Sequence, residues 1–161
     1  MVTVNRILIV DSYPLFRSTL RAFLSQEPDF QIVGMAGSMR DAIWSVGALN
    51  PDLVLTDLRM PDARGVEAVA GIKRHYPQVK ILVVSFYQEN EFKQQCRDAG
   101  AAGYVLKDAI HDDLRDGMRA VLRGRTYPDA ETADTMLPQY LQASAATGKV
   151  RQLFPQSPSP R

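Results

Sequence analysis

Cysteine, long apolar runs and a charge excess of either sign are scarce in this sequence. Its single cysteine, Cys96, excludes an internal disulfide and fits a reducing compartment. No apolar run approaches the roughly 18 residues that a membrane-spanning helix needs, and the first residues lack the layout of a signal peptide. Lys and Arg number 19 against 18 Asp and Glu, so charge alone does not indicate nucleic-acid binding. We therefore expect a soluble, cytoplasmic protein that does not contact membranes.

Five short apolar runs rich in β-branched residues predict strands at 7–10, 32–35, 53–55, 81–84 and 103–106. Most are continuously apolar rather than alternating, which is typical of strands buried on both faces. Helical spacing of apolar residues predicts helices at about 15–24, 39–49, 66–75, 89–99 and 111–123. Ser38 is a candidate N-cap for the second helix and Gly124 a candidate stop for the fifth. This alternation predicts an α/β fold, a doubly wound five-stranded parallel sheet with five flanking helices.

Four of the five predicted strands are followed by or end in a polar residue. Asp11, Asp57, Ser85 and Lys107 close strands one, three, four and five. Taken singly, such an aspartate is more often a helix cap or loop residue, and such a lysine is usually a solvated surface residue. In a parallel sheet, however, functional groups gather beyond the carboxyl ends of the strands. We therefore expect these four side chains to meet at one edge of the sheet.

This set of side chains suits phosphoryl transfer. Asp57 is the candidate nucleophile, which would form an acyl phosphate. Ser85 and Lys107 would each bind a phosphoryl oxygen. Asp11 adds a second negative charge, which calls for a divalent cation, and Mg²⁺ is the natural choice for oxygen ligands. The predicted metal ligands are Asp11, Asp57 and the backbone carbonyl of Arg59.

Several segments resemble receiver domains of bacterial two-component response regulators. They are Ile-Leu-Ile-Val-Asp ending at Asp11, Leu-Thr-Asp-Leu-Arg-Met-Pro around Asp57, Leu-Val-Val-Ser ending at Ser85, and Gly-Tyr-Val-Leu-Lys-Asp around Lys107. Three stretches are most similar to the NarL/FixJ, or LuxR-type, branch: Asp-Ser-Tyr-Pro-Leu-Phe-Arg at 11–17, Leu-Arg-Met-Pro at 58–61 and Gly-Tyr-Val-Leu-Lys-Asp at 103–108. The resemblance covers about residues 4–127.

The resemblance implies a flavodoxin-like fold of the receiver type and a signalling domain rather than an enzyme. A histidine kinase or phosphotransfer protein would donate the phosphoryl group to Asp57. Ser85 would then move toward the phosphate and Tyr104 would turn inward, reshaping the surface of the fourth helix, fifth strand and fifth helix. As a plain alternative, Tyr104 is a packed aromatic residue.

Three positions depart from the pattern of this family, one of them being Asp108, which follows Lys107 where the family commonly has Pro. Where it usually has a second acidic residue that binds the metal, this sequence has Ser12. A hydroxyl is a poorer Mg²⁺ ligand than a carboxylate, so we expect weak or absent binding by Ser12 and slower phosphorylation. The residue after Ser85 is often small, but here it is Phe86. We expect Phe86 either to hinder small donors and slow dephosphorylation or simply to pack at the base of a loop.

The domain organisation follows from where the pattern fades. We predict a receiver domain at 1–127, an extra helix or linker at 128–141, and a flexible tail rich in Pro, Ser and Ala at 142–161. Regulators of this branch usually continue into a helix-turn-helix domain, and nothing after Tyr127 has that character. DNA binding would therefore need an output domain absent from this chain. The sequence leaves open whether the chain is a stand-alone receiver or a truncated regulator.

Three functions remain open on sequence. The first is a phosphorylatable receiver within a transcriptional response regulator, and the second is a pseudo-receiver that signals by protein contact alone, which Ser12 favours. The third, a small-molecule-binding flavodoxin-like protein, would need a glycine-rich loop after the first strand, and residues 11–14 contain no glycine. A homodimer is a further expectation, because Phe16, Phe23 and Met118 add apolar surface to the first and fifth helices.

Overall fold

The fold was analysed in a computed structural model that describes residues 3–128. Apart from Pro128, the predicted linker helix and tail lie outside the described residues. The elements are, in chain order, β1 (Asn5–Val10), α1 (Pro14–Leu24), β2 (Phe30–Ala36), α2 (Met39–Leu49), β3 (Leu53–Thr56), β4 (Arg59–Met60), β5 (Ala63–Arg64), α3 (Glu67–His75), β6 (Lys80–Ser85), α4 (Asn90–Asp98), β7 (Gly103–Leu106), η1 (Lys107–Ala109), η2 (Ile110–Leu114) and α5 (Arg115–Leu122).

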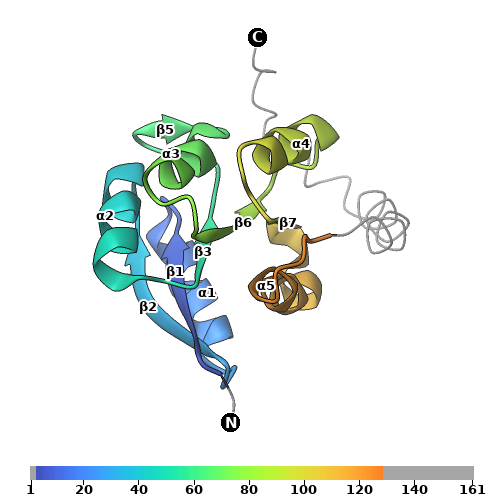
Figure 1. Ribbon diagram of the computed structural model, residues 1–161. Helices are drawn as coiled ribbons and strands as arrows, with labels where there is room; N and C mark the ends of the chain where they lie inside the picture. The colour runs from blue at the N-terminus through green and yellow to red at the C-terminus, as the bar shows by residue number, and fades with distance from the viewer. Residues whose placement is uncertain (1–2, 129–161) are drawn as a thin grey trace. The chain divides into compact units, whose positions relative to one another are not determined.

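The main sheet has five parallel strands in the order β2-β1-β3-β6-β7, which confirms the predicted doubly wound fold. The strand order reverses at β1, because the chain first moves outward to β2 and then crosses back to β3. Right-handed crossovers place α1 and α5 on one face of the sheet and α2, α3 and α4 on the other (Figure 1). The carboxyl ends of β1 and β3 therefore meet at the switch point, where sites form in such sheets.

The three central strands supply the core. In β1, Ile7, Leu8 and Ile9 are fully buried, and β3 and β6 contribute Leu53, Val54, Ile81 and Leu82, also fully buried. Each fully buried aliphatic side chain of this kind stabilises the fold by about 1.5–3 kcal/mol. The polar residues that follow these strands are consequently held on a rigid frame.

Ion pairs tie α5 to the loop between α1 and β2, two segments far apart in sequence that lie on one face of the sheet. Arg119 Nη2 lies 2.8 Å from Glu27 Oε2, and Arg119 Nε lies 3.0 Å from Asp29 Oδ2. The hydrogen bond from Arg119 holds the pKa of the Asp29 carboxyl below its ordinary value. Each pair is partly exposed and so contributes modestly, but together they fix the position of α5.

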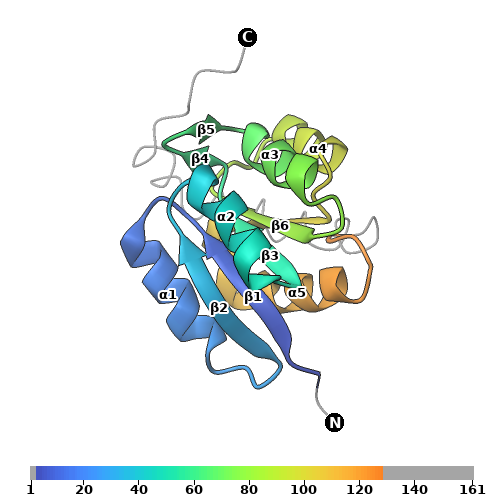
Figure 2. The same cartoon turned by 60° about the vertical axis from the view of Figure 1, so that its left-hand side comes forward.

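Helix α2 begins as the sequence predicted, with one addition. Ser38 Oγ accepts a hydrogen bond from the backbone N–H of Asp41 at 3.1 Å, which confirms Ser38 as the N-cap. The carboxylate of Asp62 also accepts from the backbone N–H groups of Met39 at 2.8 Å and Arg40 at 3.0 Å. The short antiparallel hairpin of β4 and β5, which contains Asp62 and was not predicted, thus docks on this helix (Figure 2).

The fifth helix differs from its prediction at the start. Residues 107–114 form a 3₁₀ turn and then a π-helical turn, and the regular α-helix spans only Arg115–Leu122. These irregular turns connect the end of β7 to α5. Leu114 at the end of the π-helical turn and Met118 and Val121 in α5 are fully buried. Gly124 has φ 82° and ends the helix as predicted, in a conformation that favours glycine. No helix among residues 3–128 has the length and apolar character that crossing a membrane requires.

Candidate functional site

The four polar residues at the strand ends are buried at the carboxyl edge of the sheet. Asp11, Asp57, Ser85 and Lys107 are all 5% exposed or less. Backbone bonds fix the two aspartates, because Asp11 N–H donates to the carbonyl of Ala36 at 3.0 Å and Asp57 N–H to that of Val10 at 3.0 Å. Each aspartate is thereby an extension of its strand, and its carboxylate has a defined direction.

Lys107 joins the two carboxylates. Its Nζ lies 2.7 Å from Asp11 Oδ2 and 3.3 Å from Asp57 Oδ2. Asp11 Oδ1 accepts from the backbone N–H of Tyr13 at 2.8 Å, and Asp57 Oδ1 accepts from that of Leu58 at 2.7 Å. The arrangement rejects the interpretation of Lys107 as a solvated surface residue. Two carboxylates and one ammonium thus lie together, shielded from water.

Burial raises the pKa of the Asp57 carboxyl above its ordinary value. The ammonium of Lys107 opposes this shift, and the neighbouring carboxylate of Asp11 adds to it. Two carboxylates and one ammonium leave a formal charge of −1 in a buried site, which is costly without a further counter-charge. A bound cation, or a proton on one of the carboxylates, would therefore stabilise the cluster.

The oxygen donors around this charge suit a hard divalent cation, although the set is sparse. Among residues 3–128, no three side chains of His, Cys, Asp or Glu come together as a metal-binding group. The donors are the carboxylates of Asp11 and Asp57 and, beside them in sequence, the backbone carbonyl of Arg59 and the partly exposed hydroxyl of Ser12. These groups match the chemistry of Mg²⁺, with a hydroxyl where a carboxylate would bind more strongly.

Ser85 and Tyr104 lie on neighbouring strands and are connected through the loop after β6. Tyr87 donates its backbone N–H to Ser85 Oγ at 3.2 Å, and its carbonyl accepts from the Tyr104 hydroxyl at 2.7 Å. Tyr104 is 7% exposed, and burial raises its pKa well above the ordinary value, while a hydrogen bond with Ser85 opposes the shift. The ring of Tyr104 is therefore turned inward.

Comparison with known sequences decides the family. The sequence model of the response regulator receiver domain matches residues 7–119, which include the four buried polar residues at the strand ends. The chain belongs to the response regulator receiver domain family. This match confirms the resemblance that the sequence motifs of the receiver indicate.

Its curated relatives are longer proteins. The chain is 32% identical over 135 residues to the transcriptional regulatory protein DegU of Brevibacillus brevis, an alignment that covers 84% of this chain and 57% of DegU. It is 35% identical over 126 residues to the response regulator protein VraR of Staphylococcus aureus, covering 78% of this chain and 60% of VraR. The chain thus spans less than two thirds of the length of these relatives.

Solved structures agree with the sequence match. A LuxR-family two-component response regulator from Aurantimonas sp. SI85-9A1 aligns with TM-score 0.76 and 27% identity, over 86% of this chain and 99% of that chain. The signal receiver domain of NarL from Mycobacterium tuberculosis aligns with TM-score 0.71 and 28% identity, over 76% and 99%. These similarities confirm the receiver fold and the LuxR-type branch.

Aromatic rings cover the buried ammonium of the receiver. Lys107 Nζ lies 4.0 Å from the ring centroid of Phe16, 5.2 Å from that of Phe86 and 6.0 Å from that of Tyr13. Phe86 is 39% exposed, so it stands between the site and solvent rather than deep in the core. We call Tyr13, Phe16 and Phe86 the aromatic cover.

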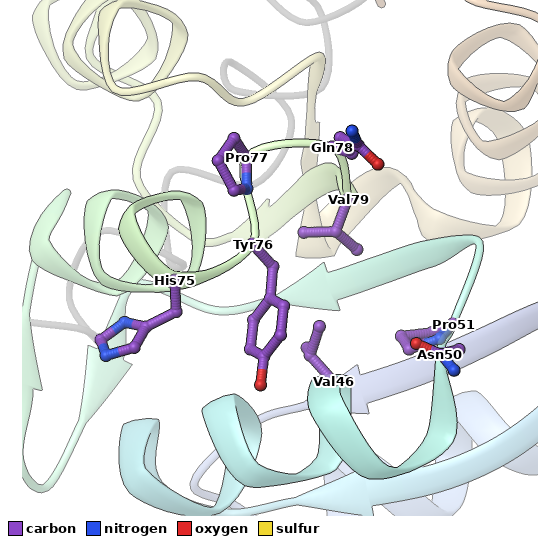
Figure 3. Close-up of a pocket in the computed structure, with 8 residues that line it drawn as sticks. All are labelled: Val46, Asn50, Pro51, His75, Tyr76, Pro77, Gln78 and Val79. Atoms are coloured by element: carbon purple, nitrogen blue, oxygen red, sulfur yellow. The ribbon is translucent and has the colours of Figure 1, made fainter.

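A separate pocket lies away from this site, between the C-terminal ends of α2 and α3 (Figure 3). Tyr76 and Val46 are among its lining residues, which come from the segments that lead into β3 and β6. The pocket therefore belongs to the amino edge of the sheet, opposite the buried carboxylates. It contains none of the site residues predicted from the sequence.

Sequence reasoning singled out Phe86 at the site but missed the other two rings of the aromatic cover and the cap formed by Asp62. Phe16 was treated only as surplus apolar surface on the first helix, yet it faces Lys107. Its position in the first turn of a helix that starts just after Asp11 is a signal that could have placed it near the site. Nothing in the local sequence around Asp62 indicates the N-terminus of α2, because the two are joined only by the tertiary fold.

Proposed function

We propose that Asp57 is the phosphoacceptor of this receiver and takes its phosphoryl group from a phosphohistidine of a histidine kinase or phosphotransfer protein. An ionised carboxylate oxygen of Asp57 bonds to phosphorus as the phosphorus–nitrogen bond of the donor breaks. The imidazole leaves with the bonding electron pair and takes up a proton, and Asp57 becomes an acyl phosphate. The observation that carries this proposal is the buried Asp57 carboxylate held beside the Lys107 ammonium and Asp11.

The neighbouring residues have complementary roles in this proposal. Lys107 offers its ammonium to a phosphoryl oxygen, and Ser85 offers its hydroxyl to another. Asp11, Asp57 and the Arg59 carbonyl would hold Mg²⁺, with Ser12 as a weak ligand or none. The bound ion supplies charge neutralisation between the carboxylates and the incoming phosphoryl oxygens. The residual negative charge of the cluster and its oxygen donors support this assignment.

The output of the switch is a change of protein contacts. Ser85 and Tyr104 already share the loop residue Tyr87 as a hydrogen-bonding partner. Movement of the Ser85 hydroxyl toward a phosphate would shift this loop and the start of α4, and would favour the inward position of the Tyr104 ring. We propose that the surface of α4, β7 and α5 changes in this way.

Phe86 gives the site a preference among phosphoryl donors. Its ring lies 5.2 Å from Lys107 Nζ and is partly exposed, so it covers the route from solvent to the ammonium. A docked protein donor can displace or bypass this ring with contacts of its own. A small donor has no such contacts, and water meets the same barrier during hydrolysis. We therefore propose slow reaction with small donors and a long-lived acyl phosphate.

Control of transcription is the proposed role of the whole regulator, because DegU carries the name of a transcriptional regulatory protein. Contact with DNA would depend on a domain outside the receiver.

A receiver homodimer also stays a prediction. Two of the three apolar residues from which the dimer was predicted give it little support, because Met118 is fully buried and Phe16 faces Lys107. Sedimentation with and without beryllofluoride would measure the dimer.

Beryllofluoride, which mimics a phosphoryl group, tests the proposed function directly. In an NMR titration of the full chain, we expect Mg²⁺-dependent shifts at Asp57, Ser85, Tyr104 and Lys107. The variant Asp57→Asn should lose them, whereas Asp41→Asn on the exposed side of α2 should keep them. Absence of binding at high Mg²⁺ would contradict the proposal and leave the alternative, a pseudo-receiver that signals by protein contact alone.

A further inference from the structure

The ammonium of Lys107 is held from two sides by groups of different chemistry. It donates hydrogen bonds to two carboxylate oxygens, and Nζ lies 2.7 Å from Asp11 Oδ2 and 3.3 Å from Asp57 Oδ2. The ring of Phe16 lies closest of the aromatic cover, with its centroid 4.0 Å from Nζ. An ammonium carries three N–H donors. Because two of them are directed at the carboxylates, an aromatic face is a favourable neighbour for the remaining side.

Phe16 is held in place by the first turn of α1. The helix starts at Pro14, whose ring presets the backbone angle of that turn. Arg17, the next residue after Phe16, donates from its guanidinium Nη1 to the backbone carbonyl of Asp11. Its backbone N–H also donates to the carbonyl of Tyr13 at 3.1 Å. The turn that carries Phe16 is therefore anchored to the same strand end that carries the Asp11 carboxylate.

An aromatic ring attracts an ammonium within about 6 Å, and more strongly where water is excluded. The Lys107 side chain is 2% exposed, so this attraction acts with little competition from solvent. Lysine has a flexible four-carbon stem, which alone does not aim its charge. Of the three rings, Phe16 is nearest, while Phe86 at 5.2 Å and Tyr13 at 6.0 Å are more distant.

We propose that Phe16 is a positioning residue, whose ring face holds the Lys107 ammonium where it meets the phosphoryl group on Asp57. This inference rests on the proposed phosphorylation of Asp57 and adds a residue to that site. It differs from simple packing in one testable respect. A packing residue is replaced well by an apolar side chain of similar size, whereas a cation–π contact needs an aromatic face.

The variants follow from that difference. Phe16→Leu keeps apolar bulk and removes the aromatic face, and Phe16→Tyr keeps the face. Phe23→Leu is a matched control two turns further along α1, because the Phe23 ring also lies under a cation, Arg115, at 4.2 Å, but far along the helix from Asp57. In excess Mg²⁺, we expect Phe16→Leu to weaken beryllofluoride binding by about twofold to thirtyfold. Phe16→Tyr and Phe23→Leu should bind as the unmodified chain does.

A second measurement reports on the contact itself and needs no functional site. Protons of the Lys107 side chain near an aromatic face are shifted upfield by the ring current, and Lys107→Arg identifies their NMR signal. We expect this upfield shift in the unmodified chain and in Phe23→Leu, and its loss in Phe16→Leu. A signal at the ordinary lysine position in the unmodified chain would overturn the proposal, even if Phe16→Leu failed to fold.

The outcomes separate the two proposals. Unchanged beryllofluoride affinity in Phe16→Leu, with normal binding by the unmodified chain, would overturn the positioning role and leave phosphorylation of Asp57 intact. No binding of beryllofluoride by the unmodified chain would overturn the proposed function, and the positioning role with it. Weaker binding and loss of the upfield shift in Phe16→Leu alone would support both.

Discussion

The ammonium of Lys107 lies 2.7 Å from the carboxylate of Asp11, and each of these side chains is only 2% exposed. A buried ion pair of this kind adds little net stability compared with apolar residues, because both charges must leave water. Its members are costly to separate, however, since removal of one leaves the other charged and unpaired. The pair therefore indicates a site kept for its chemistry rather than for the stability of the sheet.

Lys107→Met should destabilise the fold at neutral pH by about 3–5 kcal/mol, because it leaves two buried carboxylates without a cation. Burial already raises the pKa of the Asp57 carboxyl above its pKa in the unfolded chain. Ionisation of this carboxyl therefore opposes folding at pH values above the unfolded pKa. The variant should therefore regain stability as the pH falls and the carboxyl takes up a proton. Urea unfolding at neutral and mildly acidic pH measures both effects. A stability loss that did not shrink with falling pH would contradict this account.

Asp62→Ala should weaken the N-terminus of α2 and lower the unfolding free energy by about 1 kcal/mol. Bonds from the backbone N–H groups of Arg40 and Met39 hold the pKa of Asp62 below its usual 3.8. The contribution is therefore full above pH 3.8 and is lost as the pH falls through the lower folded value. Urea unfolding checks it, with Asp41→Ala on the same helix as a control for charge. Equal losses in both variants would assign the effect to helix charge and not to the cap.

Ser12→Asp should raise the affinity for Mg²⁺ by roughly tenfold or more, because a carboxylate is a stronger ligand than a hydroxyl. Titration of the protein with Mg²⁺, followed by NMR, measures the dissociation constant. Ser18→Asp adds the same charge to an exposed position on α1 and serves as the control. If both variants gained affinity equally, general electrostatic attraction and not ligation at position 12 would be the cause.

Phe86→Ala should speed both phosphorylation by a small acyl phosphate and hydrolysis of the product, severalfold in each case. The side chain is 39% exposed and lies over Lys107, so its removal opens the route to the site. Mass spectrometry of the intact chain over time gives both rates. Leu15→Ala is a suitable control, since Leu15 is 81% exposed at the start of the same α1 turn that carries Phe16. Slower reaction in Phe86→Ala would instead mean that the ring helps to hold Lys107.

Much of the fold could be predicted from the order of residues, because its signals are local. Continuous apolar runs marked the buried strands, and Ser38 and Gly124 marked helix ends through bonds within a few residues. The beginning of α5 could not be predicted in this way. Its 3₁₀ and π-helical turns at 107–114 depend on how the chain leaves β7, and no local periodicity encodes that geometry.

The site, like the fold, has features that the sequence predicts and features that depend on the tertiary structure. The sequence by itself determined that Asp11, Asp57, Ser85 and Lys107 end their strands, and parallel pairing then brings strand ends to one edge. Only the tertiary structure decided that Lys107 would be buried between two carboxylates and beneath the ring of Phe16. The reason is physical, because distances between side chains on different elements depend on packing across the whole sheet. A pattern along one strand or helix does not contain that information.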